Sequence, residues 1–192
     1  MKTILQVFSK ILIFVKRYKM KILIAGPYNS GGSRILECIR IVCKICNIPV
    51  KFGSYITFNS KIANEFEGVY IIKCNEFHEM YFNVLFFDYI FVPVRDIRYI
   101  CRTELEAIKN VRLFRCWKSQ ATKILKYEDF NTNQVVSLFN IMNIKLEIEV
   151  IQYIEEFINL NYQNKNTELL LQNSLIQKNS TLQYFLKENQ YV

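Results

Sequence analysis

The stretch "KILIAGPYNSGGSR", residues 21–34, decides the fold expected for this chain. It opens with a short, almost continuous apolar run that stops at Gly26, which is typical of a strand buried on both faces of a parallel sheet. Directly after it, residues 33–46 carry apolar side chains at steps of three and four, so we expect an amphipathic helix that ends at Asn47 and Pro49. The glycine-rich segment is therefore expected to be the loop between a first strand and a first helix.

Strand-like and helical patterns alternate through the rest of the chain. We expect strands at 69–73, 85–94 and 121–127, and helices at 97–110, 134–142 and 146–160. Strands that alternate with helices argue for parallel pairing, because parallel neighbours need long crossover connections. The expected fold class is a three-layer α/β fold with a mainly parallel central sheet flanked by helices.

A chain of 192 residues is expected to form one main domain, here residues 20–160. Residues 1–19 are expected to form an apolar or amphipathic helix, whose apolar run is shorter than the ~20 residues needed to span a bilayer. No small-residue cleavage site follows it, so a signal peptide is not expected. Its basic end favours packing on the domain or peripheral contact with a membrane, in a cytoplasmic protein. The Asn- and Gln-rich tail, 161–192, is expected to be helical or partly disordered.

The composition is that of a folded globular protein. Hydrophobic residues make up 51% and aromatic residues 15% of the chain, which excludes a disordered protein. The net charge of +8 is spread along the sequence, so it fits a solvated surface or an anionic ligand, and no nucleic-acid partner is expected. Cys43 and Cys46 form a C-x-x-C pair, but no second pair or nearby histidine completes a zinc site. The six cysteines are therefore expected to be reduced thiols, with no bound metal.

The glycine-rich loop itself is suited to binding phosphate. Ligands of open parallel sheets bind beyond the carboxyl ends of the strands, and a helix N-terminus offers N–H groups and a favourable dipole to an anion. Gly31 and Gly32 let the backbone approach a phosphate, while Ser30 and Ser33 add hydroxyl groups, and Ser33 is also expected to cap the helix. The spacing G-x-x-x-x-G-x-S places Gly32 where a nucleoside-triphosphate loop has its lysine. The alternative is an ordinary strand–turn–helix without a ligand.

Two segments, "YNSGGSRIL" at 28–36 and "VPVRDIRYICRT" at 92–103, match a known pair of motifs in type and order. They resemble the 5′-phosphosulfate loop and the 3′-phosphate-binding segment of the sulfotransferases that use 3′-phosphoadenosine 5′-phosphosulfate (PAPS). The resemblance implies a P-loop NTPase-like fold and PAPS as the co-substrate, without a metal. It also implies that the nucleotide is bound by Asn29, Ser30, Gly31, Gly32, Ser33, Arg34, Arg95 and Thr103. Asn29 departs from the family pattern, which has Lys or Arg at that position.

A third segment extends the resemblance to the catalytic residues. The segment "IIKCNEF", 71–77, is similar to the K-x-H-E-F segment of the family. The family's catalytic histidine is replaced here by Asn75, and an amide does not act as a base at neutral pH. The resemblance therefore leaves Glu76 and His78 as candidate bases, and Lys73 as a source of positive charge for the departing sulfate.

The segment "KYEDF", 126–130, is similar to a later strand end of the family, whereas the family's C-terminal glycine-rich signature is absent, because no glycine follows Gly68. The implied function is transfer of a sulfuryl group from PAPS to a hydroxyl or amine of a small-molecule, carbohydrate or peptide acceptor. The acceptor pocket is expected at 51–67 and the C-terminal helices. Two alternatives stay open: a kinase-like P-loop nucleotide-binding enzyme whose lysine comes from elsewhere, and a catalytically inactive sulfotransferase-like binding protein.

Overall fold

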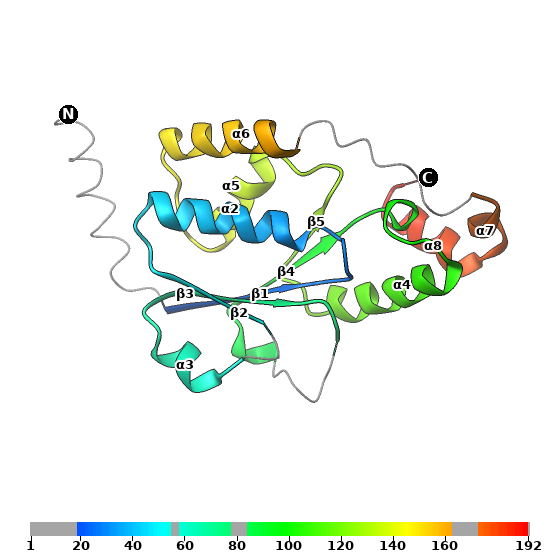
Figure 1. The fold of residues 1–192 in the computed structure, drawn as a ribbon, viewed down its shortest axis with the longest axis horizontal. Coiled ribbons are helices and arrows are strands. Elements are labelled where there is room, and N and C mark those ends of the chain that lie inside the picture. The colour runs from blue at the N-terminus through cyan, green and yellow to red at the C-terminus, as the bar shows by residue number, and fades with distance from the viewer. Residues whose placement is uncertain (1–18, 55–57, 78–83, 163–172, 192) are drawn as a thin grey trace.

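The computed structural model describes residues 19–54, 58–77, 84–162 and 173–191, and it has an α/β fold (Figure 1). Five strands form one sheet: β1 (Lys19–Ala25), β2 (Val50–Ser54), β3 (Gly68–Cys74), β4 (Tyr89–Val94) and β5 (Lys123–Lys126). Their order is β2-β3-β1-β4-β5, and every neighbouring pair is parallel. The expected α/β fold with a parallel central sheet is therefore confirmed.

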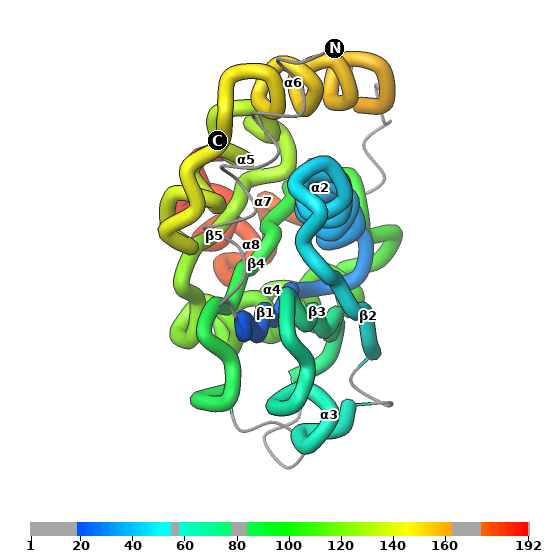
Figure 2. Tube along the Cα trace, turned by 90° about the vertical axis from the view of Figure 1, so that its left-hand side faces the viewer, coloured from blue at the N-terminus to red at the C-terminus, as the bar shows by residue number. Residues whose placement is uncertain are grey.

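Helices connect the strands and cover both faces of the sheet (Figures 1 and 2). The α-helices are α2 (Gly32–Ile45), α3 (Ser60–Glu65), α4 (Glu104–Lys118), α5 (Thr132–Ile141), α6 (Ile148–Tyr162), α7 (Asn173–Lys178) and α8 (Ser180–Glu188). Two short 3₁₀ helices, η2 (Val84–Phe86) and η3 (Ile97–Tyr99), flank β4. One face of the sheet packs against α2, α5 and α6, and the other packs against α3, α4, α7 and α8.

The central strand β1 contributes to both cores by simple alternation. Ile22 and Ile24 pack into the core beneath α2, α5 and α6, whereas Leu23 and Ala25 pack into the core beneath α4 and α8. Successive side chains of a strand point to opposite faces, so a strand covered on both sides needs apolar residues at every position. All four residues are at most 1% exposed, and this explains the continuous apolar run in the sequence.

The two strands that carry the sequence signatures are neighbours in the sheet. β1 pairs with β4, with Ile22 opposite Tyr89. The connection after β1 enters α2 on one face, whereas the connection after β4 leads to α4 on the other face (Figure 1). Neighbouring strands whose connections diverge in this way leave a crevice at their carboxyl ends, where ligands of open α/β sheets bind.

The structure corrects the helix expected at 97–110. This segment forms two helices, because two side chains each start one: the Asp96 carboxylate accepts a bond from the Arg98 N–H at 2.9 Å to begin η3, and the Thr103 hydroxyl accepts one from the Glu106 N–H at 3.2 Å to begin α4. The sequence prediction also missed β2. An edge strand packs against one neighbour only, and β2 is largely exposed, so its apolar signal is weak.

Three helices end in the same left-handed turn. The residue after the helix cap has a positive φ in each case, and the next N–H returns to a carbonyl in the last helical turn, as in a Schellman motif. The left-handed residues are Asn47 (φ 53), Asn143 (φ 58) and Gln190 (φ 60), and the returning bonds are Ile48 N–H to Cys43 O, Ile144 N–H to Phe139 O and Tyr191 N–H to Leu186 O. The expected end of α2 at Asn47 is thus confirmed.

The N-terminal helix expected at 1–19 lies outside the described residues, except for Lys19, which already belongs to β1. Within the described ranges, no helix is both long and apolar enough to cross a membrane. The C-terminal part of the chain includes α7 and α8, and α8 packs on α4 through the rings of Phe114 and Phe185, whose centroids are 5.6 Å apart.

Candidate functional site

A pocket of about 710 Å³ lies at the carboxyl ends of the central strands. Its walls come from four parts of the chain: the glycine loop, the end of β3, the segment from β4 into α4, and the residue after β5. The lining residues are Pro27, Tyr28, Asn29, Ser30, Gly31, Gly32, Ser33, Arg34, Lys73, Asn75, Arg95, Tyr99, Ile100, Arg102, Glu106, Lys109, Asn110 and Tyr127. Both sequence signatures therefore contribute to one pocket.

The shape of the loop depends on Gly31. Its φ of 106° lies in the left-handed region, where side chains other than hydrogen are strained. A Cβ at this position would also lie 2.5 Å from Cδ2 of Tyr127. Asn29, at φ 61°, makes a second left-handed turn two residues earlier. Gly31 is thus required both by the backbone conformation and by the close approach of the Tyr127 ring.

The hydroxyl of Ser30 stabilises the loop from within. Ser30 is 3% exposed, and its Oγ donates a hydrogen bond to the carbonyl oxygen of Pro27 at 2.6 Å. A serine hydroxyl has one hydrogen, so this bond uses the only side-chain donor of Ser30. Ser30 lines the pocket and its hydroxyl stabilises the loop, whereas its contact with a bound phosphate stays a prediction.

Ser33 does not cap α2, contrary to the sequence prediction. The N-cap is Gly31, and no side chain caps this helix. Instead, the Ser33 Oγ accepts a hydrogen bond from Nζ of Lys73 at 2.9 Å. The first N–H groups of a helix lack carbonyl partners in a preceding turn. In α2 the Arg34 N–H bonds to the Gly31 carbonyl at 3.0 Å, and no side chain caps the N–H groups before it. The loop thus combines open backbone donors with an ammonium group that β3 supplies.

Two guanidinium groups lie against the ring of Tyr127. The Cζ of Arg34 is 3.7 Å from the ring centroid, and the Cζ of Arg95 is 4.1 Å from the same centroid. Arg34 also contacts Tyr162 at 4.4 Å. Burial, with a smaller contribution from the charge of Arg95, lowers the pKa of Arg34. Arginine remains charged at neutral pH in spite of this shift. A bound anion that contacts both guanidinium groups would offset the electrostatic repulsion between them.

The pocket as a whole is strongly basic. The described lining residues include five basic side chains, Arg34, Lys73, Arg95, Arg102 and Lys109, and one carboxylate, Glu106. That carboxylate accepts a bond from the Arg102 N–H at 2.8 Å. A concave surface lined by one sign of charge concentrates ligands of the opposite sign. The arrangement is suited to a ligand with several negative charges.

Two of the predicted site residues that the structure describes, Thr103 and Glu76, do not line the pocket. Thr103 caps α4, while its neighbour Arg102 reaches the pocket. Glu76 follows Asn75, which does line the pocket, and its carbonyl oxygen accepts a contact from the Cys74 thiol at 2.8 Å. His78 lies outside the described residues. None of the described residues within 51–67, the region expected to form an acceptor pocket, lines this one.

Among the lining residues that were not predicted, Tyr127, Arg102 and Lys109 contribute an aromatic ring and two of the basic groups. Tyr127 directly follows β5, so the rule that ligands bind at the carboxyl ends of strands would have indicated it. To predict Arg102 and Lys109, the sequence analysis would have had to place the start of α4 at Glu104, whereas it expected a helix from residue 97. Lys109 lies one helical turn beyond Glu106, so the two residues share the face that reaches the pocket.

The cysteines are all free thiols, and five of the six are buried. Burial raises the pKa of both Cys38 and Cys43 to about 12, so these side chains behave as small apolar groups. In the part of the chain that the structure describes, no group of three or more His, Cys, Asp or Glu residues is arranged to hold a metal ion.

No known protein-family model matches this chain, and no curated protein does either. The case for its function therefore rests on the two sequence signatures and on the pocket that they share.

Proposed function

We propose that this chain is a sulfotransferase with a P-loop-like nucleotide site, which moves a sulfuryl group from PAPS to a hydroxyl or amine acceptor. The observation that carries this proposal is the meeting of the two signature segments. Residues 28–36 and 92–103 lie far apart in the sequence, yet both line one basic pocket at the crevice between β1 and β4. Segments that follow neighbouring parallel strands meet at the carboxyl edge of any such sheet, so the support comes from which segments meet there: the two that resemble the family's nucleotide-binding signatures, in a basic pocket.

The 5′-phosphosulfate end is assigned to the glycine loop. The open N–H groups at the start of α2 bind phosphate or sulfate oxygens, and the Lys73 ammonium lies beside them at Ser33. Each charge-assisted hydrogen bond of this kind contributes roughly 1.5–3 kcal/mol. Lys73 thus provides the positive charge that Asn29 cannot provide.

The 3′-phosphate end is assigned to the segment after β4. Arg95 lines the pocket against Tyr127, and Arg102 adds a second guanidinium from the start of α4. Thr103 caps α4 through its oxygen and does not line the pocket, so its proposed contact with the phosphate would use the hydroxyl hydrogen and is the weakest part of this assignment. Guanidinium groups are suited to this role because their fork of donors matches phosphate geometry.

PAPS supplies an activated sulfuryl group, and an acceptor oxygen or nitrogen bonds to its sulfur as the bond to the phosphate oxygen breaks. Lys73 is placed to stabilise the negative charge that develops on that phosphate oxygen. The proton of the acceptor requires a base, and Glu76 and His78 remain the proposed candidates. Glu106 is the one carboxylate among the lining residues that the structure describes.

The position of Lys73 also favours a second candidate. A kinase-like enzyme needs a lysine at the phosphate loop, and Lys73 brings an ammonium there from β3 rather than from the loop itself. A ligand of this class would be a nucleoside triphosphate with Mg²⁺. The same pocket without catalysis would make the chain a sulfonucleotide-binding protein.

Retention on immobilised 3′-phosphoadenosine 5′-phosphate, the product nucleotide, separates these functions. The wild-type protein is expected to be retained without Mg²⁺, and Arg95→Ala is expected to abolish retention. Arg112→Ala is the matched control, because Arg112 is exposed on α4 and does not line the pocket. Binding of ATP with Mg²⁺ but not of the bisphosphate would favour the kinase-like enzyme. Binding without transfer to a panel of sugars, phenols and tyrosyl peptides would favour the inactive protein.

A further inference from the structure

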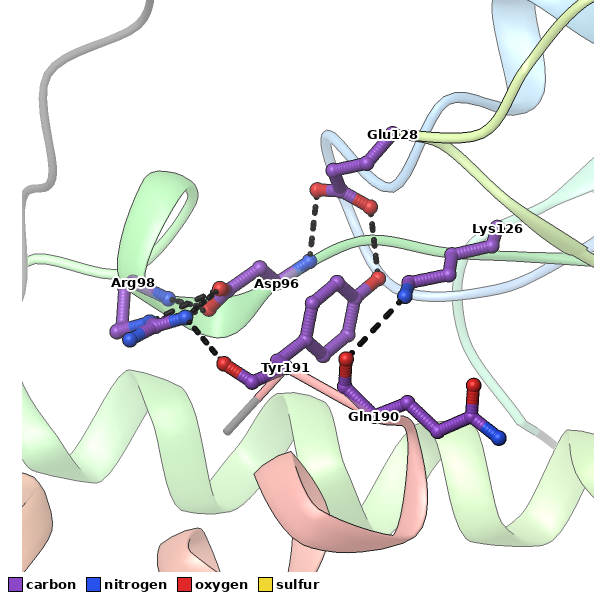
Figure 3. A network of polar contacts seen from close by, with 6 residues as sticks. All are labelled: Asp96, Arg98, Lys126, Glu128, Gln190 and Tyr191. Atoms are coloured by element: carbon purple, nitrogen blue, oxygen red, sulfur yellow. Dashed lines mark hydrogen bonds and ion pairs between the residues drawn. The ribbon is translucent and has the colours of Figure 1, made fainter.

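The last described residues of the chain return to the two loops that carry the pocket residues Arg95 and Tyr127. Helix α8 ends in the left-handed turn at Gln190, and the Tyr191 N–H bonds to the Leu186 carbonyl at 2.8 Å. This turn directs Tyr191 away from the helix axis and into a network of polar contacts (Figure 3).

A single carboxylate joins Tyr191 to the backbone beside Arg95. The hydroxyl of Tyr191 donates to Glu128 Oε2 at 2.7 Å, and Glu128 Oε1 accepts the N–H of Asp96 at 3.1 Å (Figure 3). Asp96 directly follows Arg95 in the chain. Glu128 therefore connects the hydroxyl of Tyr191 to the peptide bond between Arg95 and Asp96.

A second connection runs through Arg98. Its Nη2 donates to the carbonyl oxygen of Tyr191 at 2.9 Å, and its guanidinium also binds both carboxylate oxygens of Asp96. Asp96 is 1% exposed, so its charge needs these partners. The ion pair between buried Asp96 and partly exposed Arg98 thus holds the loop after β4, and the Tyr191 carbonyl oxygen is a further acceptor for Arg98.

The residues on both sides of Tyr127 also contact this end of the chain. Glu128 binds the Tyr191 hydroxyl as described, and Lys126 lies over the Tyr191 ring, with Nζ 4.4 Å from its centroid. The Lys126 Nζ also donates to the carbonyl oxygen of Gln190 at 3.5 Å. Burial, together with the hydrogen bond to Glu128, raises the pKa of Tyr191, so its hydroxyl remains a donor at neutral pH.

We propose that Tyr191 is a positioning residue for the pocket: it ties the loop after β4 to the loop after β5 and so sets the relative placement of Arg95 and Tyr127. Tyr191 does not itself line the pocket. The identity of the ligand rests on the proposed function, whereas the connection between the two loops does not.

The test compares Tyr191→Phe with Glu188→Gln. The first variant keeps the ring and removes only the hydroxyl that binds Glu128. The second is the matched control, because Glu188 forms an ion pair with Lys118 that joins the same end of α8 to α4 rather than to either loop. Two measurements are made on the full chain: hydrogen exchange of the Asp96 amide in the free protein, and the dissociation constant for 3′-phosphoadenosine 5′-phosphate.

Tyr191→Phe is expected to accelerate exchange of the Asp96 amide and to raise the dissociation constant about fivefold, the effect of losing one hydrogen bond. Glu188→Gln is expected to leave both within about twofold, since it alters neither loop. In a Glu128→Ala background the connection is already broken, so adding Tyr191→Phe is expected to change neither quantity further.

Three results would overturn the proposal. Equal effects of Tyr191→Phe and Glu188→Gln would mean that Tyr191 only anchors α8. Faster exchange at Asp96 with an unchanged dissociation constant would mean that the connection does not reach the pocket. Unchanged exchange in Tyr191→Phe would mean that Tyr191 does not hold the loop. If the wild-type protein does not bind the bisphosphate, the proposed function fails, and the exchange measurements alone decide the role of Tyr191.

Discussion

The substitution Gly31→Ala tests whether the glycine loop has the shape described here. Two separate costs follow from the structure. A φ of 106° is strained for alanine, which costs about 1–3 kcal/mol. The new Cβ would also lie 2.5 Å from the ring of Tyr127, and relieving an overlap of this kind costs roughly another 1–3 kcal/mol. The free energy of unfolding is therefore expected to fall by about 2–6 kcal/mol.

Urea unfolding of matched variants separates these two costs. Gly32→Ala is the control, because its Cβ would meet Ile24 at 3.3 Å, and alanine is favoured within a helix, so a change below about 1 kcal/mol is expected. In a Tyr127→Ala background the overlap is gone, so Gly31→Ala is expected to cost only the backbone part, about 1–3 kcal/mol. The reasoning is refuted if Gly31→Ala costs no more than Gly32→Ala, or if removing the Tyr127 ring does not reduce its cost.

Two further predictions concern the charge at the loop and the buried thiols. Lys73→Ala is expected to lower the rate of sulfuryl transfer about 100-fold while weakening nucleotide binding much less, which steady-state kinetics and a binding titration would check. An unchanged turnover rate would contradict this role. The pKa of Cys38 and of Cys43 is raised by burial from 9.0 to about 12, so the unfolded chain loses these protons at a lower pH than the folded protein does. Their contribution to stability is complete below pH 9 and is lost as the pH rises toward 12, by up to about 1.4 kcal/mol per pH unit for each thiol. Urea unfolding measured from neutral to alkaline pH should therefore show a steep decline that the double variant Cys38→Ala, Cys43→Ala flattens, and an equally steep decline in that variant would contradict the argument.

The parts of the fold that the sequence predicted are those with strong local signals. The run before Gly26 predicted β1 because a strand between two helical layers is apolar at every position. The apolar period after it predicted α2, and Asn47 marked its end. β2 escaped prediction because an edge strand buries little, so its sequence lacks both a continuous apolar run and a clear alternation.

The parts of the site that the sequence did not predict depend on contacts between distant segments. The sequence shows a lysine at 73 and a serine at 33, but the parallel register of β1 and β3 brings them within 2.9 Å. The ring of Tyr127 lies against Gly31 because β5 ends beside β4. Neither contact has a local signature. Residues of the segments 28–36 and 92–103 do line one pocket, but Tyr127, in the segment 126–130, was not predicted to line it with them.

The pocket lies between the two helical layers, so ligand binding is expected to affect the stability of the whole fold. One wall of the pocket belongs to the layer of α2, and the opposite wall belongs to the layer of α4, on the other face of the sheet. A polyanion that binds both Arg34 and Arg95 would therefore link the two helical layers and stabilise the folded protein. A ligand that binds only the folded protein raises its stability by about 2.7 kcal/mol at one hundred times its dissociation constant. Melting temperatures measured with a panel of anions would therefore rank these anions by how strongly they stabilise the folded protein.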